Sequence, residues 1–254
     1  MTTTTTSTKR HAAKNAAMRK PKDPTKSRAE ILAAAIPEFA TRGLEGARVD
    51  AIARRTRTTR AMIYYYFGSK EGLYVAVLEN AYRGIREAEK TLDLGHAPPV
   101  EAMLRLVAFT LDYYQEHPSF VALVIAENQS GGRHIRKVNR MHRLNLSIVD
   151  VIGDVLGRGA REGIFRADVD PVDLHMTIAS LGWFQIANRH TFGYIFGRDF
   201  DSPRQIEHNK RLITDVVLRF VSADANPKHP GHRAVSVTAS TYEEKRPSSR
   251  DSLP

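Results

Sequence analysis

Helical periodicity runs through almost the whole chain between Ser27 and Ser222, and it constrains the fold more than any other feature. Apolar residues recur at intervals of three and four, as they do on one face of an α-helix. The segments end at capping residues, or at glycine and proline. We find no convincing strand and no internal repeat. The sequence therefore predicts an all-α protein of about nine helices.

Capping and helix-breaking residues set the expected boundaries. Ser27-Arg28-Ala29-Glu30 is a capping box that opens the first helix, and Gly43 ends it. Pro37 lies inside this helix and predicts a kink or local strain, because proline donates no backbone hydrogen bond. Ser69 caps a long fourth helix. The other expected helices are 49–55, 60–67, 99–116, 118–129, 134–162, 171–196 and 203–222, the last two opening with Asp170-Pro171 and Ser202-Pro203.

Composition excludes several classes of protein. The chain has 254 residues and no cysteine, so disulfides and thiolate metal sites are ruled out. No apolar run approaches the ~20 residues that a membrane span needs. The N-terminus lacks the apolar segment of a secretory signal. Its basic, hydroxyl-rich composition loosely resembles an organelle transit peptide, but it has no amphipathic apolar stripe. We therefore expect a cytoplasmic protein with no membrane partner.

The net charge of +10 is concentrated at the N-terminus. Residues 1–28 contain eight Lys or Arg and one acidic residue, Asp23. A basic arm beside a small basic domain suggests a polyanion partner, most simply nucleic acid. The alternative is a solvated tail without a partner. Both ends, 1–26 and 223–254, lack periodic apolar residues and are expected to be disordered.

Two expected helices are unusually short. Segments 49–55 and 60–67 are too short to persist alone, and only residues 56–59 separate them. Two short helices joined by such a turn and supported by a longer first helix form a helix-turn-helix. In that motif the second helix enters the major groove of DNA.

Helix geometry divides the aromatic residues of "RAMIYYYF". Ile63 and Phe67, four residues apart, form the inward pair, and Tyr66 lies to one side of them. Tyr64 and Tyr65 lie on the opposite face, together with Ala61 near its centre. A small residue there lets the helix backbone approach a partner closely. The alternative is that the tyrosine rings pack in a core or an oligomer contact.

Hydroxyl and basic side chains surround the start of this helix. Thr58, Thr59 and Arg60 stand at its N-terminus, where backbone N–H groups and the helix dipole favour phosphate. Lys70 follows at the start of the next helix. This grouping suits phosphate positioning with a few contacts to base edges.

The segment "SRAEILAAAIPEFATRGLEGARVDAIARRTRTTRAMIYYYFGSKEGLY" resembles the DNA-binding domain of the tetracycline-repressor (TetR) family of bacterial transcriptional regulators. The matching features are "ILAAA…F…G", "V..IA" and, most specifically, "YYYF.SKE.L". The resemblance implies a helix-turn-helix domain at 27–72 and contact between Lys70 and phosphate. The residues that it implies on the DNA face are Thr59, Arg60, Ala61, Tyr64, Tyr65 and Tyr66.

The sequence departs from the family pattern at two positions. Arg48 replaces the usual Ser or Thr cap of the second helix, which loses ~1 kcal/mol of capping and can add a phosphate contact. Arg57 occupies a turn position where glycine is common, so the turn either holds a left-handed arginine or takes another geometry. Both departures leave the operator sequence open.

The resemblance assigns the remaining helices, 73–222, to ligand binding and dimerisation. The segment 171–196 is apolar almost all round, and Ala179, Gly182 and Ala187 would allow close helix approach. Pairing of 171–196 and 203–222 across a two-fold axis would give a homodimer suited to a pseudo-palindromic operator. The expected apolar stripe of 203–222 is Ile206, Leu212, Ile213, Val216, Val217 and Phe220.

A pocket for an effector should show as polar groups within apolar helical surroundings. For each candidate the alternative is a satisfied core residue or a hydrogen bond in the dimer interface. The histidines lack metal-ligand spacing, and we predict neither a metal nor a cofactor. The candidates are Glu127, Asn128, His142, Asn145, His175 and Trp183.

These features together predict a sequence-specific transcriptional regulator that a small molecule releases from its operator. The sequence contains no phosphate loop, nucleophile elbow or supported acid pair, so we do not expect an enzyme. The alternative function is non-specific architectural DNA binding through the basic arm. The effector, the operator, the regulated genes and the sign of regulation stay open.

Overall fold

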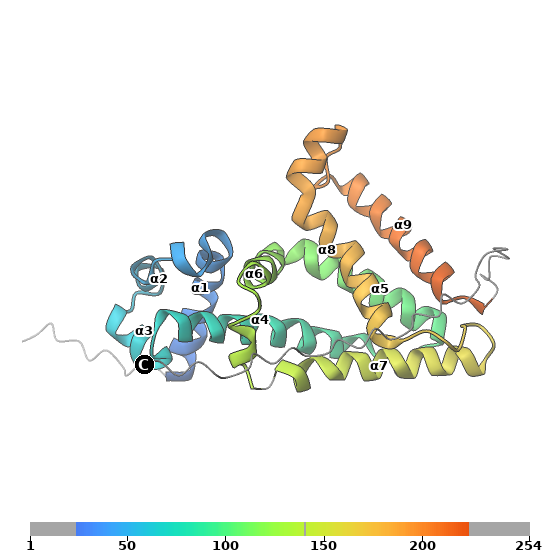
Figure 1. Ribbon diagram of the computed structural model, residues 1–254, viewed down its shortest axis with the longest axis horizontal. Coiled ribbons are helices and arrows are strands. Elements are labelled where there is room, and N and C mark those ends of the chain that lie inside the picture. Colours follow the sequence, from blue (N-terminus) through green and yellow to red (C-terminus); the bar gives the residue numbers. More distant parts are fainter. Residues whose placement is uncertain (1–23, 140, 224–254) are drawn as a thin grey trace, which may run out of the picture.

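The computed structural model describes residues 24–139 and 141–223, in which nine α-helices and two short 3-10 helices account for nearly all regular structure (Figure 1). One isolated bridge, between Phe165 and Ser222, is the exception within these residues. None of the described helices is both long and apolar enough to cross a membrane. The α-helices are α1 (Pro24–Gly46), α2 (Val49–Thr56), α3 (Arg60–Phe67), α4 (Lys70–Glu89), α5 (Pro99–Glu116), α6 (Pro118–Gln129), α7 (Met141–Arg161), α8 (Pro171–Phe196) and α9 (Pro203–Val221).

Helices α1 to α3 and the first half of α4 form one unit with its own core, at the left of Figure 1. The ring of Phe39 on α1 meets the ring of Tyr74 on α4 edge-on, with centroids 5.1 Å apart. Leu123 of α6 also joins this core. The central side chains are almost fully buried: Ile31, Phe39, Ile52, Ile63, Leu73 and Val77.

The predicted caps of α3 and α4 are confirmed. Thr59 Oγ1 accepts a hydrogen bond from the Met62 N–H at 3.2 Å, and Ser69 Oγ accepts one from Gly72 at 2.9 Å. Gly43 breaks α1 with φ 62° and ψ −178°, a conformation that favours glycine. The backbone keeps helical angles at Pro37, so the strain expected there does not show in the dihedral angles.

Two predicted boundaries are wrong. Helix α1 begins by Pro24, so Ser27 lies inside it and does not cap it, and residues 24–26 belong to the helix and not to a disordered arm. The expected helix 134–162 divides into a 3-10 turn, Ile135–Lys137, and α7. The backbone N–H groups of His134 and Ile135 donate to the Glu127 carboxylate, and the α-helix begins only at Met141. Residues 1–23 and 224–254, the rest of the two expected tails, lie outside the described residues.

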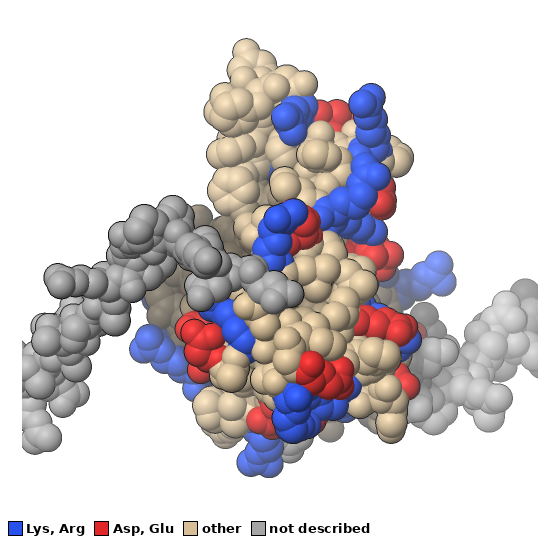
Figure 2. All heavy atoms as spheres, turned by 90° about the vertical axis from the view of Figure 1, so that its right-hand side faces the viewer, with Lys and Arg blue, Asp and Glu red and all other residues tan. Residues whose placement is uncertain are grey.

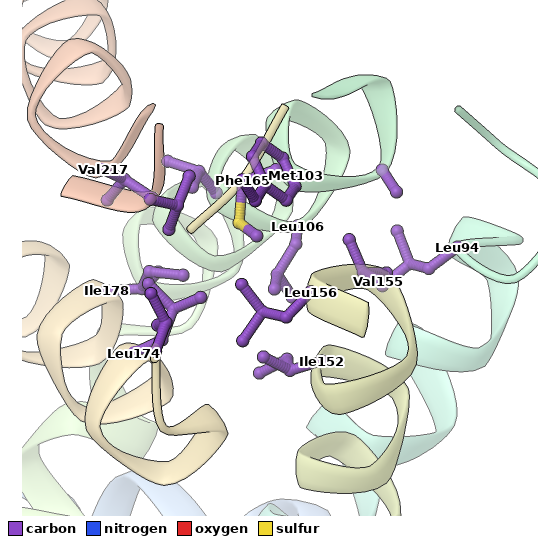
Figure 3. Close-up of a cluster of buried hydrophobic side chains, with 14 of the residues drawn as sticks. Leu94, Met103, Leu106, Ile152, Val155, Leu156, Phe165, Leu174, Ile178 and Val217 are labelled. Atoms are coloured by element: carbon purple, nitrogen blue, oxygen red, sulfur yellow. The ribbon is translucent and has the colours of Figure 1, made fainter. Parts of the chain in front are cut away.

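The second half of α4 and the remaining helices form a second unit, in which α5, α7, α8 and α9 enclose a second core (Figure 3). Met103 and Leu106 of α5, Ile152 and Leu156 of α7, and Leu174 of α8 point toward one another in it. The predicted proline-led starts of α8 and α9 are confirmed, with Asp170 and Ser202 as caps. Beyond this core, α8 and α9 project together away from α7 (Figure 1).

The apolar stripe predicted for α9 divides into two. Ile213 and Val217 are buried in the core, whereas Leu212, Val216 and Phe220 face outwards and are 36 to 52% exposed. Helix α8 exposes further apolar side chains: Val172, Met176, Phe184, Tyr194, Ile195 and Phe196. Figure 2 shows the end of the molecule away from α3, where part of the upper projection carries neither acidic nor basic residues. Two helices therefore present an apolar outer surface that the described part of the chain does not cover.

Candidate DNA interface and ligand cavity

A buried carboxylate replaces the missing cap of α2. Arg48 occupies the N-cap position, and its side chain makes no capping hydrogen bond. Its backbone N–H donates instead to Glu38 Oε1 of α1 at 3.1 Å. The Glu38 side chain is 3% exposed and also pairs with Arg42 at 3.4 Å and Arg55 at 3.2 Å. Glu38 thus fixes the start of α2 and leaves the Arg48 side chain exposed.

The turn between α2 and α3 uses a left-handed residue. Arg57 has φ 51° and ψ 35°, the first of the two geometries considered for this position. A non-glycine residue there is strained by roughly 1 kcal/mol or more. The N–H of Thr58 donates back to Ala53 at 3.1 Å and closes the helix end. The turn brings Thr58 and Thr59 to the start of α3.

Helix α3 presents one exposed face. Tyr65 is 79% exposed, and Ala61 beside it is also exposed. Ile63 on the opposite side is fully buried. Met62 is 39% exposed on this surface as well, and sequence reasoning missed it because an apolar side chain is usually placed inwards.

The other aromatic residues of α3 lie at the edges of this face. Tyr64 is half-buried, and the Arg60 guanidinium lies 5.8 Å from its ring centroid. Tyr66 and Phe67 are also half-buried, and both pack against the core of the first unit. Arg28 of α1 stacks over the Phe67 ring at 4.8 Å, a contact that the sequence did not reveal. The inward role expected for Phe67 is therefore only partly fulfilled.

Two of the basic candidates already have partners. The Lys70 ammonium donates to the Glu45 carbonyl at 2.8 Å, near the end of α1. Arg60 pairs with Asp50 at 3.6 Å. The hydrogen bond with Tyr64 and the charge of Asp50 raise the pKa of Arg60. Arg60 is exposed at the N-terminus of α3, and Lys70 lies at the N-terminus of α4, and a phosphate would be attracted to either helix start.

A cavity of about 770 Å³ lies in the second unit, between α4, α5, α6, α7 and α8. The structure brings four of the six candidate ligand residues together in its wall: Asn128, Asn145, His175 and Trp183. Its volume is in the range of small-molecule sites. The other lining residues are Tyr82, Arg86, Tyr114, Phe120, Val124, Ile125, Gln129, Met176, Ala179, Ser180 and Phe184.

The structure places Glu127 and His142 outside this wall. Glu127 is buried, and it accepts hydrogen bonds from His134 N at 2.7 Å, His134 Nδ1 at 2.9 Å and Ile135 N at 2.9 Å. Burial alone would raise the pKa of Glu127, but these bonds hold it below its ordinary value. Glu127 therefore anchors the segment between α6 and α7. His142 is exposed near the start of α7.

A buried ion pair, of which only the arginine lies in the cavity wall, escaped sequence reasoning. Arg86 and Glu89 of α4 are 5% and 7% exposed, and Arg86 Nη2 lies 3.1 Å from Glu89 Oε1. Burial raises the pKa of Glu89 to about 7, although Arg86 opposes this shift. Opposite charges three residues apart are typical of a solvated helix face, so the local pattern did not indicate that this pair is buried.

These features define a ligand-responsive helix-turn-helix DNA-binding protein. Residues 31–77 match the model of the bacterial regulatory proteins of the tetR family, and 99–217 match the tetracyclin repressor-like C-terminal domain. The HTH-type transcriptional repressor NicS of Pseudomonas putida is 37% identical over 194 residues, 76% of this chain and 92% of that protein. The repressor SCO4008 of Streptomyces coelicolor is 35% identical over 44% of this chain and 54% of its own length. The chain belongs to the TetR family.

Solved structures agree at the level of the fold. Transcriptional regulator SCO4942 of Streptomyces coelicolor matches with a TM-score of 0.58 and 24% identity over 77% of this chain and 98% of that chain. The ketosteroid regulator KstR2 of Mycobacterium tuberculosis matches with a TM-score of 0.57 and 20% identity over 80% and 97%. Members of this family are regulators and not enzymes, and family membership does not favour the architectural alternative.

Proposed function

We propose that this protein is a homodimeric repressor in the bacterial cytoplasm that binds a pseudo-palindromic operator and leaves it when a small molecule fills the cavity. One observation carries the DNA-binding part. Tyr65 and Ala61 stand exposed on a capped short helix whose opposite side is fully buried. A rigidly held helix with an exposed outer face can enter a major groove.

The apolar outer surface of α8 and α9 supports the dimer. Leu212, Val216 and Phe220 project from one side of α9 in the single chain, and exposed α8 residues extend this surface. Covering such a surface with a second copy removes apolar area from water at roughly 25 cal/mol per Å². Leu212→Glu should therefore give monomers in analytical ultracentrifugation. If this variant remains a dimer, the dimer interface does not include this surface of α9.

Two helices connect the cavity to the DNA-binding unit. Helix α4 carries Arg86 in the cavity wall and Lys70 beside α3, roughly 24 Å apart at the rise of an α-helix. Helix α6 lines the cavity with Phe120 and Val124, and it places Leu123 in the core of the first unit. A ligand that prefers one arrangement of these helices would change the separation of the two α3 helices. The difference in the affinity of the ligand for the two arrangements sets how far it can shift the protein away from the DNA-binding arrangement.

The test of DNA binding compares a duplex selected from a random library with an unselected duplex. We expect the selected duplex to bind far more tightly, and Tyr65→Ala to abolish the difference while the dimer stays intact. Tyr65→Phe separates the ring from its hydroxyl. Equal affinity for the two duplexes would favour the architectural alternative. Retained selectivity in Tyr65→Ala would show that another face of the protein reads the DNA.

The basic N-terminal segment, residues 1–23, provides a second test. Neutralising phosphates releases counterions, so each contact steepens the fall of affinity with salt. Deleting 1–23 should flatten this dependence if the segment touches DNA. If the dependence of DNA affinity on salt is unchanged, the segment is a solvated tail that does not contact DNA.

A further inference from the structure

Three buried side-chain nitrogen atoms in the described part of the chain have no hydrogen-bond partner: Arg86 Nε, Arg86 Nη1 and Trp183 Nε1. Both residues line the same cavity. All three atoms are donors. A buried donor without an acceptor is costly, and native structures keep few of them. Two residues of the cavity wall therefore hold three donors that lack an acceptor.

The charge of the cavity wall has one sign. Among the described residues, Arg86 is the only Lys, Arg, Asp or Glu in the wall. Glu89 lies outside the wall and engages only Nη2 of the guanidinium, so it leaves the other two nitrogen atoms free. Burial, with a smaller contribution from the charge of Arg86, lowers the pKa of His175 to about 4, so this side chain is neutral at pH 7. An anion is the ligand that balances such a wall.

Five of the other described wall residues carry Tyr, Phe or Trp rings. Tyr114 and Phe120 lie nearly parallel, with ring centroids 6.0 Å apart, and Trp183 and Phe184 line the cavity from α8. Aromatic walls favour flat ligands, which make offset or edge contacts with the rings. The volume of about 770 Å³ accommodates one or two fused rings.

We propose that the effector is a flat aromatic acid whose carboxylate accepts hydrogen bonds from Arg86, with Trp183 Nε1 as a further donor. A carboxylate oxygen accepts charge-assisted hydrogen bonds from a guanidinium nitrogen, and such bonds are about twice as strong as neutral ones. This inference rests on the proposed function, because it names the ligand class of the same cavity. It also gives α4 the charged contact through which the ligand would act on the DNA-binding unit.

The experiment uses Trp183, the only tryptophan of the chain, as its reporter. Benzoate and 2-naphthoate are titrated while tryptophan emission is followed, and each is compared with its own carboxamide, which has the same shape without the charge. We expect at least one acid to bind ten to a hundred times more tightly than its amide. Arg86→Met should remove this preference. Arg83→Met, the same change at an exposed position of α4, should keep it.

Circular dichroism checks that each variant is folded. If Arg86→Met does not fold, Arg86→Met with Glu89→Gln replaces it, because this pair leaves no unpaired buried charge. The proposal is overturned if neither acid binds better than its amide, or if the preference survives without Arg86. Operator binding by the ligand-free protein is measured in parallel. Selective DNA binding without a preference for the acid would overturn only the proposed ligand class. A preference for the acid without DNA binding would overturn the proposed function as a DNA-binding regulator.

Discussion

Gly159 of α7 lies beneath the ring of Phe165, and this contact predicts the effect of a single methyl group. A Cβ at Gly159 would lie 2.6 Å from the ring Cγ and 2.8 Å from Cε2, distances that real Cβ atoms do not show. The ring has little freedom to move, because Phe165 is 4% exposed and donates its N–H to the Gly159 carbonyl at 3.1 Å. The next residue, Arg166, is held to the end of α9 by a hydrogen bond to Val221 at 2.9 Å.

Two other glycines of α7 are matched controls for the change Gly159→Ala. A Cβ at Gly153 or Gly157 would have its nearest contact at 3.5 Å, an ordinary separation. Alanine at these two positions should stabilise the helix by up to about 1 kcal/mol. At Gly159 the same gain is opposed by overpacking, about 1–3 kcal/mol, and by more if Phe165 leaves the core, up to about 5 kcal/mol. We therefore expect Gly159→Ala to be less stable than the controls by about 2–4 kcal/mol.

Thermal unfolding followed by circular dichroism measures this difference. Each kcal/mol corresponds to roughly 2–4 °C for a domain of this size, so Gly159→Ala should unfold on the order of 5–15 °C below Gly157→Ala. The order of the three variants, and not only the size of the effect, is the test. If Gly159→Ala is as stable as the two controls, Gly159 and the Phe165 ring are not in this close contact.

The remaining predictions concern two buried carboxyl groups. Glu38→Ala should lower the free energy of unfolding by about 2–4 kcal/mol in urea titrations, because it leaves the Arg48 N–H without its charged acceptor. Arg42→Ala, at a partner that is 57% exposed, should cost less than about 1 kcal/mol, and equal losses would contradict the role of Glu38. Glu89 has a pKa of about 7 in the folded protein, above its unfolded value, so its contribution to stability is complete below about pH 4.5 and is lost as the pH rises to 7. Glu89→Gln stays neutral, so its stability relative to the unmodified protein should rise between pH 5 and 8 in parallel urea titrations. A constant difference would mean that Glu89 is charged throughout this range.

Local sequence determined the helices and the DNA-binding unit. Thr59, Ser69, Asp170 and Ser202 cap their helices as predicted, because a cap involves only the next few residues. The two short helices and their turn follow from the same local signals. The outward position of Tyr65 follows from the fixed angle between successive helical residues.

Tertiary structure alone decided which polar residues are buried and what they contact. Glu38 lies in α1, ten residues before Arg48, and its carboxylate caps α2. Glu127 accepts hydrogen bonds from the segment that follows α6 and does not line the cavity. The single apolar stripe expected on α9 became two, because α9 packs against α5 and α8 and buries Ile213 but not Leu212. Arg86 and Glu89 have the spacing of an ordinary surface pair, yet both are buried, and the arginine lies in the wall of a cavity that helices α4 to α8 line. Spacing along a helix reports a direction, but whether that direction meets water or another helix depends on residues far away in the sequence.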